Sequence, residues 1–474
     1  MSTGVTELNS FVESLIEGSK RKKTCIMSLP LELLVEIFLF TVNTPLNDEK
    51  PSRYNMSSHL YRGDPQAALR KFFRLSWVSG CWREIVWSTP RLLAETVIGI
   101  NLGICTDLDA TESWLTGSSP YCVSVCMIRA CENADLEVVK RTRDLLLPTV
   151  SRWRNLDIDD LHFFLHLNLP PGAFTSLERL HVRAFSECCV PLVHAFASFP
   201  RLRSFNLRAG NTIPKLNLFQ HLPWWQLTEI DIEDDSLGWC RAVLLQCTNL
   251  VYAKIATSSE WDLAPEAAET PMVVLPFLAT FIVTFGRADY IVGLDAFLLP
   301  LCLPSLKVLD VEFDSHLDHW PEEAFSVFQS RSPKITELTL LYCPIRSDEL
   351  VTLLRYAPAL TTLTIHFGCS AGGFDDDFLE SLTYDDADLA PLAPKLENLH
   401  FECPPDWFAL DPLKLAIVSR WWADDHRLLP DGSSPRVSRF KSVRIDCTEA
   451  EAAWSSHLEA WMGMLVPGLD FKVT

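Results

Sequence analysis

A short apolar pattern recurs through most of this chain and constrains its fold more than any other feature of the sequence. The pattern is Φ-x-x-Φ-x-Φ, where Φ is an apolar residue, and its first eight intervals span 23 to 29 residues, followed by intervals of 36 and 44. The copies begin at Trp153, Leu177, Leu202, Leu227, Leu250, Leu278, Leu306, Ile335, Leu360, Leu396 and Phe440. Each copy fits a short strand, and a regular period of this length predicts stacked repeats instead of separate globular domains.

Proline and helical runs support the same interpretation. Proline stands two residues before the first apolar position at Pro200, Pro276, Pro304, Pro333, Pro358 and Pro394. It ends a preceding helix and needs no partner in a strand ladder. Helical spacing lies between the strands at 191–199, 237–247, 322–329, 348–356 and 413–422. A strand and a helix in each unit of 20 to 29 residues is typical of leucine-rich repeats, so we predict an α/β solenoid with a parallel inner sheet and outer helices.

We place this solenoid at residues 94–447, with 94–150 as an irregular first repeat whose strands we do not assign, because its apolar stretches are short. A capping helix at 448–474 is expected to cover the last repeat, which would otherwise expose its core edge.

A different pattern occupies the first hundred residues. Residues 28–40 form a predicted helix, in which Ser28 can cap the first turn and Pro30 supplies a fixed φ. Apolar residues lie on two sides of this helix, so it needs a cover on two sides. Two further helices are predicted, at 66–76 and between Ser79 and Pro90. We therefore expect a mobile leader at 1–26 and a trihelical module at 27–93.

The first and third helices of this module resemble an F-box, especially the fungal kind. The matching residues are Leu29-Pro30-x-Glu32-Leu33-Leu34-x-Glu36-Ile37-Phe38 and Leu75-x-x-Val78-x-x-x-Trp82-Arg83-x-Ile85-Val86-x-Ser88-Thr89-Pro90-x-Leu92. The resemblance implies docking to the Skp adaptor of a cullin-RING ubiquitin ligase. It implies these adaptor-facing candidates: Leu29, Pro30, Leu33, Leu34, Ile37, Phe38, Trp82, Ile85 and Val86. The alternative is that these residues form only a helical core.

The strand pattern also predicts which side chains line the inner face of the solenoid. We number the positions of each copy from its first apolar residue. If the apolar side chains point into the core of the solenoid, the side chains at positions 3, 5 and 7 point to the concave face. A basic group there adjoins an acidic one, which would suit a partner with the opposite order of charges. The target-binding candidates are Arg179, His181, Arg183, Arg208, Glu229, Asp231 and Glu233. The alternative is a solvated face whose charges pair across neighbouring strands.

Composition argues against several other functions. The chain carries 41 basic and 61 acidic residues, a formal charge of −20, which disfavours nucleic-acid binding. We find no signal peptide, no apolar run long enough to span a membrane and no regular cysteine framework, so we expect an intracellular protein of the cytoplasm or nucleus. The run Lys20 to Lys23 would be a nuclear import signal or simply a solvated leader.

Catalytic motifs are also missing from the sequence. We find no Gly-rich phosphate loop, no G-x-S-x-G and no H-E-x-x-H, and the pair His162 and His166 has no second ligand pair at zinc-site spacing. We therefore expect no enzyme activity, cofactor or metal. The leading hypothesis is a substrate-recognition subunit of an SCF-type ubiquitin ligase, and its alternative is a leucine-rich-repeat scaffold without ligase function.

Overall fold

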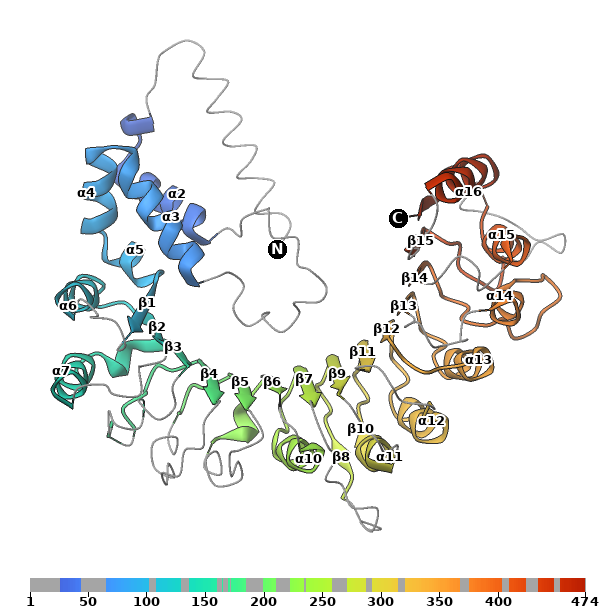
Figure 1. Cartoon of the computed structure of the whole chain (residues 1–474), viewed down its shortest axis with the longest axis horizontal. Coiled ribbons are helices and arrows are strands. Elements are labelled where there is room, and N and C mark those ends of the chain that lie inside the picture. The colour runs from blue at the N-terminus through green and yellow to red at the C-terminus, as the bar shows by residue number, and fades with distance from the viewer. Residues whose placement is uncertain are drawn as a thin grey trace. The chain divides into compact units, whose positions relative to one another are not determined.

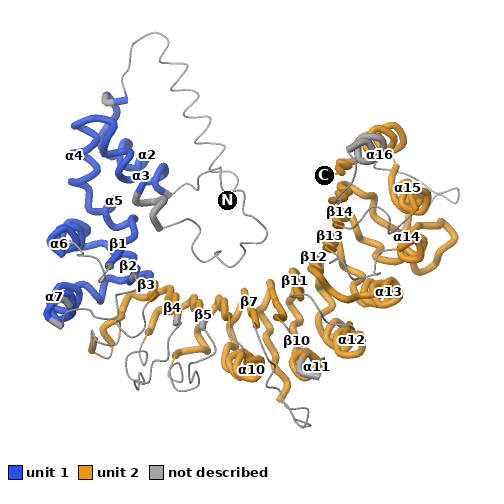
Figure 2. Tube along the Cα trace, viewed as in Figure 1, with its two compact units in different colours: residues 1–156 blue, residues 157–474 orange. Residues whose placement is uncertain are grey.

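The chain divides into two compact units, residues 1–156 and 157–474, in a computed structural model (Figures 1 and 2). The structure describes residues 26–43, 65–101, 108–128, 136–159, 164, 169–170, 172–184, 199–209, 222–233, 236–257, 271–286, 292–313, 320–366, 375–402, 409–422, 434–446 and 452–473. The predicted leader, the run Lys20 to Lys23 and most of the predicted helix at 191–199 lie outside these residues.

Unit 1 begins with the predicted trihelical module. Its elements are η2 (Ile26–Ser28), α2 (Leu31–Asn43), α3 (Pro65–Val78), α4 (Gly80–Ser88) and the short α5 (Pro90–Ala94). One apolar core joins the helices, and the ring centroids of Phe38 on α2 and Trp82 on α4 lie 4.6 Å apart. Ser79 caps α4, because its Oγ accepts a hydrogen bond from the backbone N–H of Trp82 at 3.2 Å.

The cap at Ser79 gives a prediction for unit 1. Replacing Ser79 with Ala removes the acceptor for one orphan N–H, so we expect the free energy of unfolding to fall by about 1 kcal/mol. Urea unfolding measures the change. The control is Ser88→Ala, because the Ser88 hydroxyl only donates to the Ile85 carbonyl within the same helix. Equal stability of the two variants would contradict a capping role.

The rest of unit 1 contains the first strands and helices of the repeat pattern. These elements are β1 (Val97–Asn101), α6 (Leu108–Gly117), β2 (Val123–Ile128), α7 (Leu136–Leu146), η4 (Val150–Arg152) and β3 (Trp153–Ile158), and β1 pairs in parallel with β2. Trp114 of α6 packs against Phe72 and Trp87, with ring centroids 5.0 and 5.5 Å away. The predicted domain boundary after residue 93 thus lies inside unit 1, and β3 contains the division between the units.

Unit 2 is a parallel sheet with helices on one side. Its main strands, in spatial order, are β4 (Arg179–Ala184), β5 (Ser204–Ala209), β6 (Glu229–Glu233), β7 (Tyr252–Thr257), β9 (Thr280–Phe285), β11 (Val308–Phe313), β12 (Glu337–Leu341), β13 (Thr362–His366), β14 (Asn398–Glu402), β15 (Ser442–Asp446) and β16 (Asp470–Val473). A separate parallel pair is formed by β8 (Val273–Val274) and β10 (Leu301–Cys302).

The helices of unit 2 lie on the convex side of this sheet, as Figure 1 shows. They are η5 (Trp224–Gln226), α10 (Leu237–Gln246), α11 (Val292–Leu298), α12 (Glu322–Ser330), α13 (Ser347–Arg355), α14 (Asp376–Leu382), α15 (Leu410–Ser419) and α16 (Ala452–Leu465). The strands line the concave side. This arrangement of strand and helix repeats is the predicted leucine-rich-repeat solenoid.

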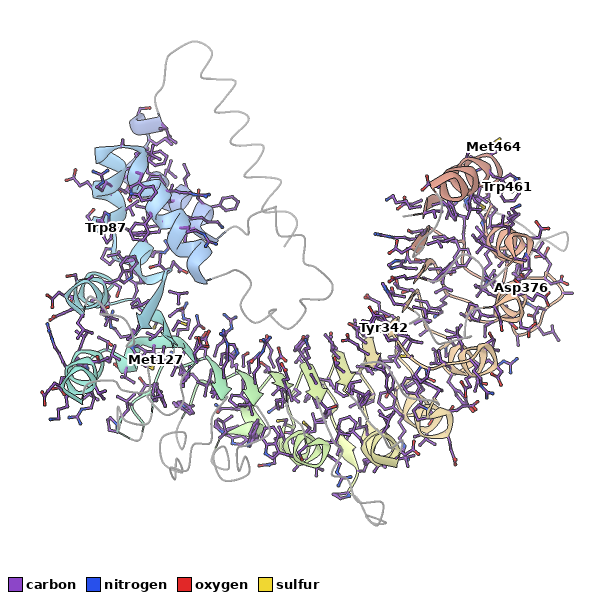
Figure 3. All side chains as sticks on the ribbon, in the orientation of Figure 1. Trp87, Met127, Tyr342, Asp376, Trp461 and Met464 are labelled. Atoms are coloured by element: carbon purple, nitrogen blue, oxygen red, sulfur yellow. The ribbon has the colours of Figure 1, made fainter. Side chains whose placement is uncertain are left out.

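Burial alternates along β11 as the pattern predicts. In β11, Leu309, Val311 and Phe313 are buried in the layer between sheet and helices, while Val308, Asp310 and Glu312 are only partly covered. Figure 3 shows side chains on both faces of the strands of unit 2. The alternation places positions 3, 5 and 7 of each copy on the concave face.

Every copy of the apolar pattern corresponds to a strand, from β3 to β15. Helix α14 and strand β16 are among the elements that were not predicted. Helix α14 starts in an acidic segment, where Asp375 caps it by accepting from the N–H of Phe378, and carboxylates favour a helix N-terminus. Strand β16 follows the terminal helix α16 within the predicted cap segment 448–474 and pairs with β15, so this segment adds a strand to the sheet as well as a helix.

Candidate protein-binding surfaces

Helix α2 exposes one of its two apolar sides. Leu33, Ile37 and Phe40 are 44%, 40% and 58% exposed and follow each other at spacings of four and three, which puts them on one face of the helix. Pro30, also exposed, continues this line by one turn. We call these four residues the α2 stripe.

The opposite side of α2 is buried in the module. Leu34 and Phe38 are 3% and 0% exposed, and they pack with Ile85 and Val86 of α4 in the core. Among the predicted adaptor-facing residues, the structure therefore assigns these four to the core. Leu29 and Trp82 are partly buried against that core, and Pro30, Leu33 and Ile37 face outward. Their contact with an adaptor stays a prediction.

Further exposed apolar residues lie on the same module. Leu31, Trp77, Val78 and Trp87 are 55%, 71%, 60% and 43% exposed. Leu31, Phe40 and Trp77 were not among the predicted adaptor-facing residues, because those were the residues that carry the resemblance. Helical spacing alone places Phe40 in line with Leu33 and Ile37.

The basic group on the concave face of unit 2 is largely paired with acidic side chains. His181 Nδ1 lies 3.2 Å from Asp157 Oδ1, and Arg183 contacts both Asp157 Oδ2 at 3.3 Å and Asp159 Oδ1 at 2.8 Å. Arg208 Nε lies 3.8 Å from Glu233 Oε2. The predicted alternative, pairing of charges across strands, thus describes His181, Arg183 and Arg208, while Arg179 is exposed.

A second paired group lies on the concave face of β13 to β15. His366 Nδ1 is 2.5 Å from Glu402 Oε2, and His400 Nε2 is 2.8 Å from Asp446 Oδ2. The two imidazole rings contact each other with centroids 5.2 Å apart. These histidines and carboxylates neutralise one another when the imidazoles are protonated.

Between these two groups the concave face is acidic. We define the acidic sector as Glu229, Asp231, Glu233, Asp310, Glu312 and Glu337, on strands β6, β11 and β12. Asp231 is 6% exposed and accepts a hydrogen bond from Asn206 Nδ2 at 2.9 Å. Desolvation raises the pKa of Asp231 to about 6, although Lys254 and Arg208 oppose this rise. Burial also raises the pKa of the Tyr252 phenol, and three carboxylates add to that rise, those of Asp231, Asp310 and Glu229.

The described residues offer neither a metal site nor a membrane span. No three His, Cys, Asp or Glu side chains there come together as ligands for a metal ion. None of the described helices has the length and apolar content to cross a bilayer. The pair His162 and His166 lies outside the described part of the chain.

Comparisons with known proteins show similarity in fold only. No protein-family model and no curated protein matches the chain. Among 42 matching chains of solved structures is the TLR13–ssRNA13 complex, with 13% identity, 81% of this chain and 62% of that chain covered, and a TM-score of 0.37. The yeast Rad7–Elc1 complex matches with 12% identity, 87% and 94% coverage and a TM-score of 0.41. The leucine-rich-repeat protein LegL7 of Legionella pneumophila matches with 14% identity, 62% and 90% coverage and a TM-score of 0.29.

Proposed function

We propose that this chain is the substrate-recognition subunit of an SCF-type ubiquitin ligase. The trihelical module docks the Skp adaptor and, through it, the cullin-RING ligase, and the repeat solenoid binds a protein target. The chain itself makes and breaks no covalent bond. It contributes by holding the target near the ubiquitin-loaded enzyme, which raises the effective concentration of the target lysine.

One observation carries the proposal: α2 is apolar on two sides, and the described residues of its own module cover only one of them. Burying an apolar side chain of this size contributes about 1.5 to 3 kcal/mol, so the exposed α2 stripe favours association with a partner. The stripe lies on the helix that carries the first half of the F-box resemblance.

The α2 stripe gives a direct test. Leu33→Asp combined with Ile37→Asp should reduce capture of purified Skp adaptor by the full chain on the order of a hundredfold, because two carboxylates would be buried in an apolar contact. Both side chains are exposed, so the fold itself should be unchanged. Adaptor binding is measured by pull-down and quantified by titration.

A matched control makes the same chemical change elsewhere. Leu415→Asp with Met464→Asp replaces two residues on unit 2 that are 59% and 74% exposed; Met464 is labelled in Figure 3. This variant should bind adaptor as the wild type does. Equal recovery by both variants, or no recovery by the wild type, would contradict the proposal and favour the scaffold hypothesis.

A further inference from the structure

The edge of the unit 2 sheet at which the strands begin gathers cations. Each copy of the apolar pattern has one residue directly before and one directly after its first apolar residue, just ahead of the strand. For β5, β6, β7, β9, β11 and β12 the structure describes all of these residues, which we call the strand-start edge: Arg201, Arg203, Gln226, Thr228, Asn249, Val251, Phe277, Ala279, Ser305, Lys307, Lys334 and Thr336. Four of them are cations and none is a carboxylate, in a chain whose formal charge is −20.

Backbone hydrogen bonds join these residues into a continuous row. The N–H of Thr228 donates to the carbonyl oxygen of Arg203 at 2.8 Å. The next copies repeat this bond, from Val251 to Thr228, from Ala279 to Val251 and from Lys307 to Ala279, at 2.8 to 2.9 Å. From Arg203 to Lys307 the row covers four strand intervals, or about 19 Å.

The four cations lie at the two ends of this row. Arg201 and Arg203 precede β5, Lys307 precedes β11 and Lys334 precedes β12, and all four residues are exposed. Within the part of the chain that the structure describes, no ion pair and no side-chain hydrogen bond engages them. The acidic sector begins in the next row, on the concave face, and none of its carboxylates lies within ion-pair distance of these four. The edge therefore attracts an acidic partner.

Exposed apolar side chains lie between the two groups of cations. Trp225, directly before Gln226 of the edge, is 63% exposed, Val251 is 45% exposed and Phe277 is 58% exposed. They belong to three consecutive copies, and Asn249 Nδ2 donates to the Trp225 carbonyl oxygen at 2.8 Å across two of them. Adjacent exposed aromatic and aliphatic side chains with charged groups around them are typical of the centre of a protein interface.

A polypeptide with carboxylates on both sides of an apolar centre matches this order of groups. In an extended chain, alternate side chains lie on one face, so residues 1, 3, 5 and 7 span about 20 Å, close to the distance from Arg203 to Lys307. A nucleic-acid strand fits less well, because its phosphates repeat at every nucleotide, whereas the three central copies carry no cation at the edge.

We propose that the strand-start edge from β5 to β12 binds an extended acidic polypeptide segment in which Asp or Glu flanks two apolar side chains. This inference rests on the proposed role of the solenoid in binding a protein target. It places the contact at the edge of the sheet, and not on the basic group of the concave face, which is largely paired.

The test uses the full chain and a fluorescein-labelled nine-residue peptide with Glu at positions 1, 7 and 9, Phe at 3, Leu at 5 and Ser elsewhere. Fluorescence anisotropy is recorded at about 150 mM salt, where long-range attraction is screened. The wild type should bind this peptide at least about tenfold more tightly than the analogue with Lys in place of Glu. Charge reversal by Arg203→Glu with Lys307→Glu should weaken binding by about tenfold to a hundredfold, and Trp225→Ser with Phe277→Ser should weaken it as much.

A control variant makes the same change of charge elsewhere on unit 2. Arg355 and Lys395 are exposed and lie outside the β5 to β12 edge, and Arg355→Glu with Lys395→Glu should leave peptide affinity within about twofold of the wild type. An equal loss in both charge variants, or no binding by the wild type, would overturn the inference. Tighter binding of a nine-nucleotide oligouridylate that depends on the same cations would also overturn it. The Leu33→Asp, Ile37→Asp variant should bind the peptide normally, so failure of the adaptor proposal is recognised separately.

Discussion

Replacing Arg420 with Met should lower the free energy of unfolding by about 3 to 5 kcal/mol, the largest effect that we expect from a single substitution in this chain. Arg420 is fully buried directly after α15. Its guanidinium donates to the carbonyl oxygens of Leu382 at 2.9 Å and Ala393 at 3.0 Å, and also to that of Leu392. Met fills the volume but leaves these three buried acceptors without donors.

The charge of Arg420 is retained at neutral pH. Burial lowers the pKa of its guanidinium to about 10, which is still well above 7. Arg420→Lys should therefore keep the charge and lose only part of the stability, because an ammonium cannot match the planar fork of a guanidinium.

Arg436→Met is the matched control for Arg420→Met. Arg436 is exposed, and its Nη1 donates to the carbonyl oxygen of Asp388 at 2.9 Å, which water can replace. Loss of this hydrogen bond should lower the free energy of unfolding by about 0.5 kcal/mol or less. Urea unfolding followed by circular dichroism compares the two variants, and midpoints within error of each other would show that the three hydrogen bonds of Arg420 are unimportant.

Asp231→Asn should stabilise the fold at pH 8 by about 2 to 3 kcal/mol. Because the pKa of Asp231 is raised from 3.8 to about 6, the folded state holds its proton at a pH where the unfolded chain has released it. The contribution of the protonated Asp231 carboxyl to the stability of the fold is present below pH 4 and is lost as pH rises through 6. Asn is neutral throughout and still accepts from Asn206 Nδ2.

The difference in the free energy of unfolding between the Asp231→Asn variant and the wild type should therefore shrink as pH falls from 8 to 4. Urea unfolding at several pH values measures it, with Asp385→Asn as an exposed control that should change stability by less than about 0.5 kcal/mol. If the stability gained by Asp231→Asn grew toward pH 4, that result would contradict the desolvation argument.

Much of the fold was predictable because the apolar pattern has a simple physical meaning. A strand buried on one face needs apolar residues at alternate positions, so each copy of the pattern located a strand to within two residues. Helix α14 was missed because acidic residues at its first turn suggested a loop. Strand β16 was missed because its sequence, Asp470–Val473, lacks the full pattern.

The candidate surfaces were predicted less completely. Helical spacing showed that α2 is apolar on two sides, but only packing against α3 and α4 decided that Leu34 and Phe38 are buried while Leu33 and Ile37 are exposed. The concave charges could be mapped from strand positions. Which of them are paired depends on distances such as that between Arg183 and Asp157, which sequence spacing does not contain.

By itself, the sequence determined the repeat period, the strand positions and the face on which each strand residue lies, since these follow from local periodicity. The tertiary structure alone decided which charges compensate one another and which buried groups lack partners. Arg420 serves three carbonyls from two distant segments. Desolvation and pairing depend on neighbours brought together from distant parts of the chain, and local sequence does not determine those neighbours.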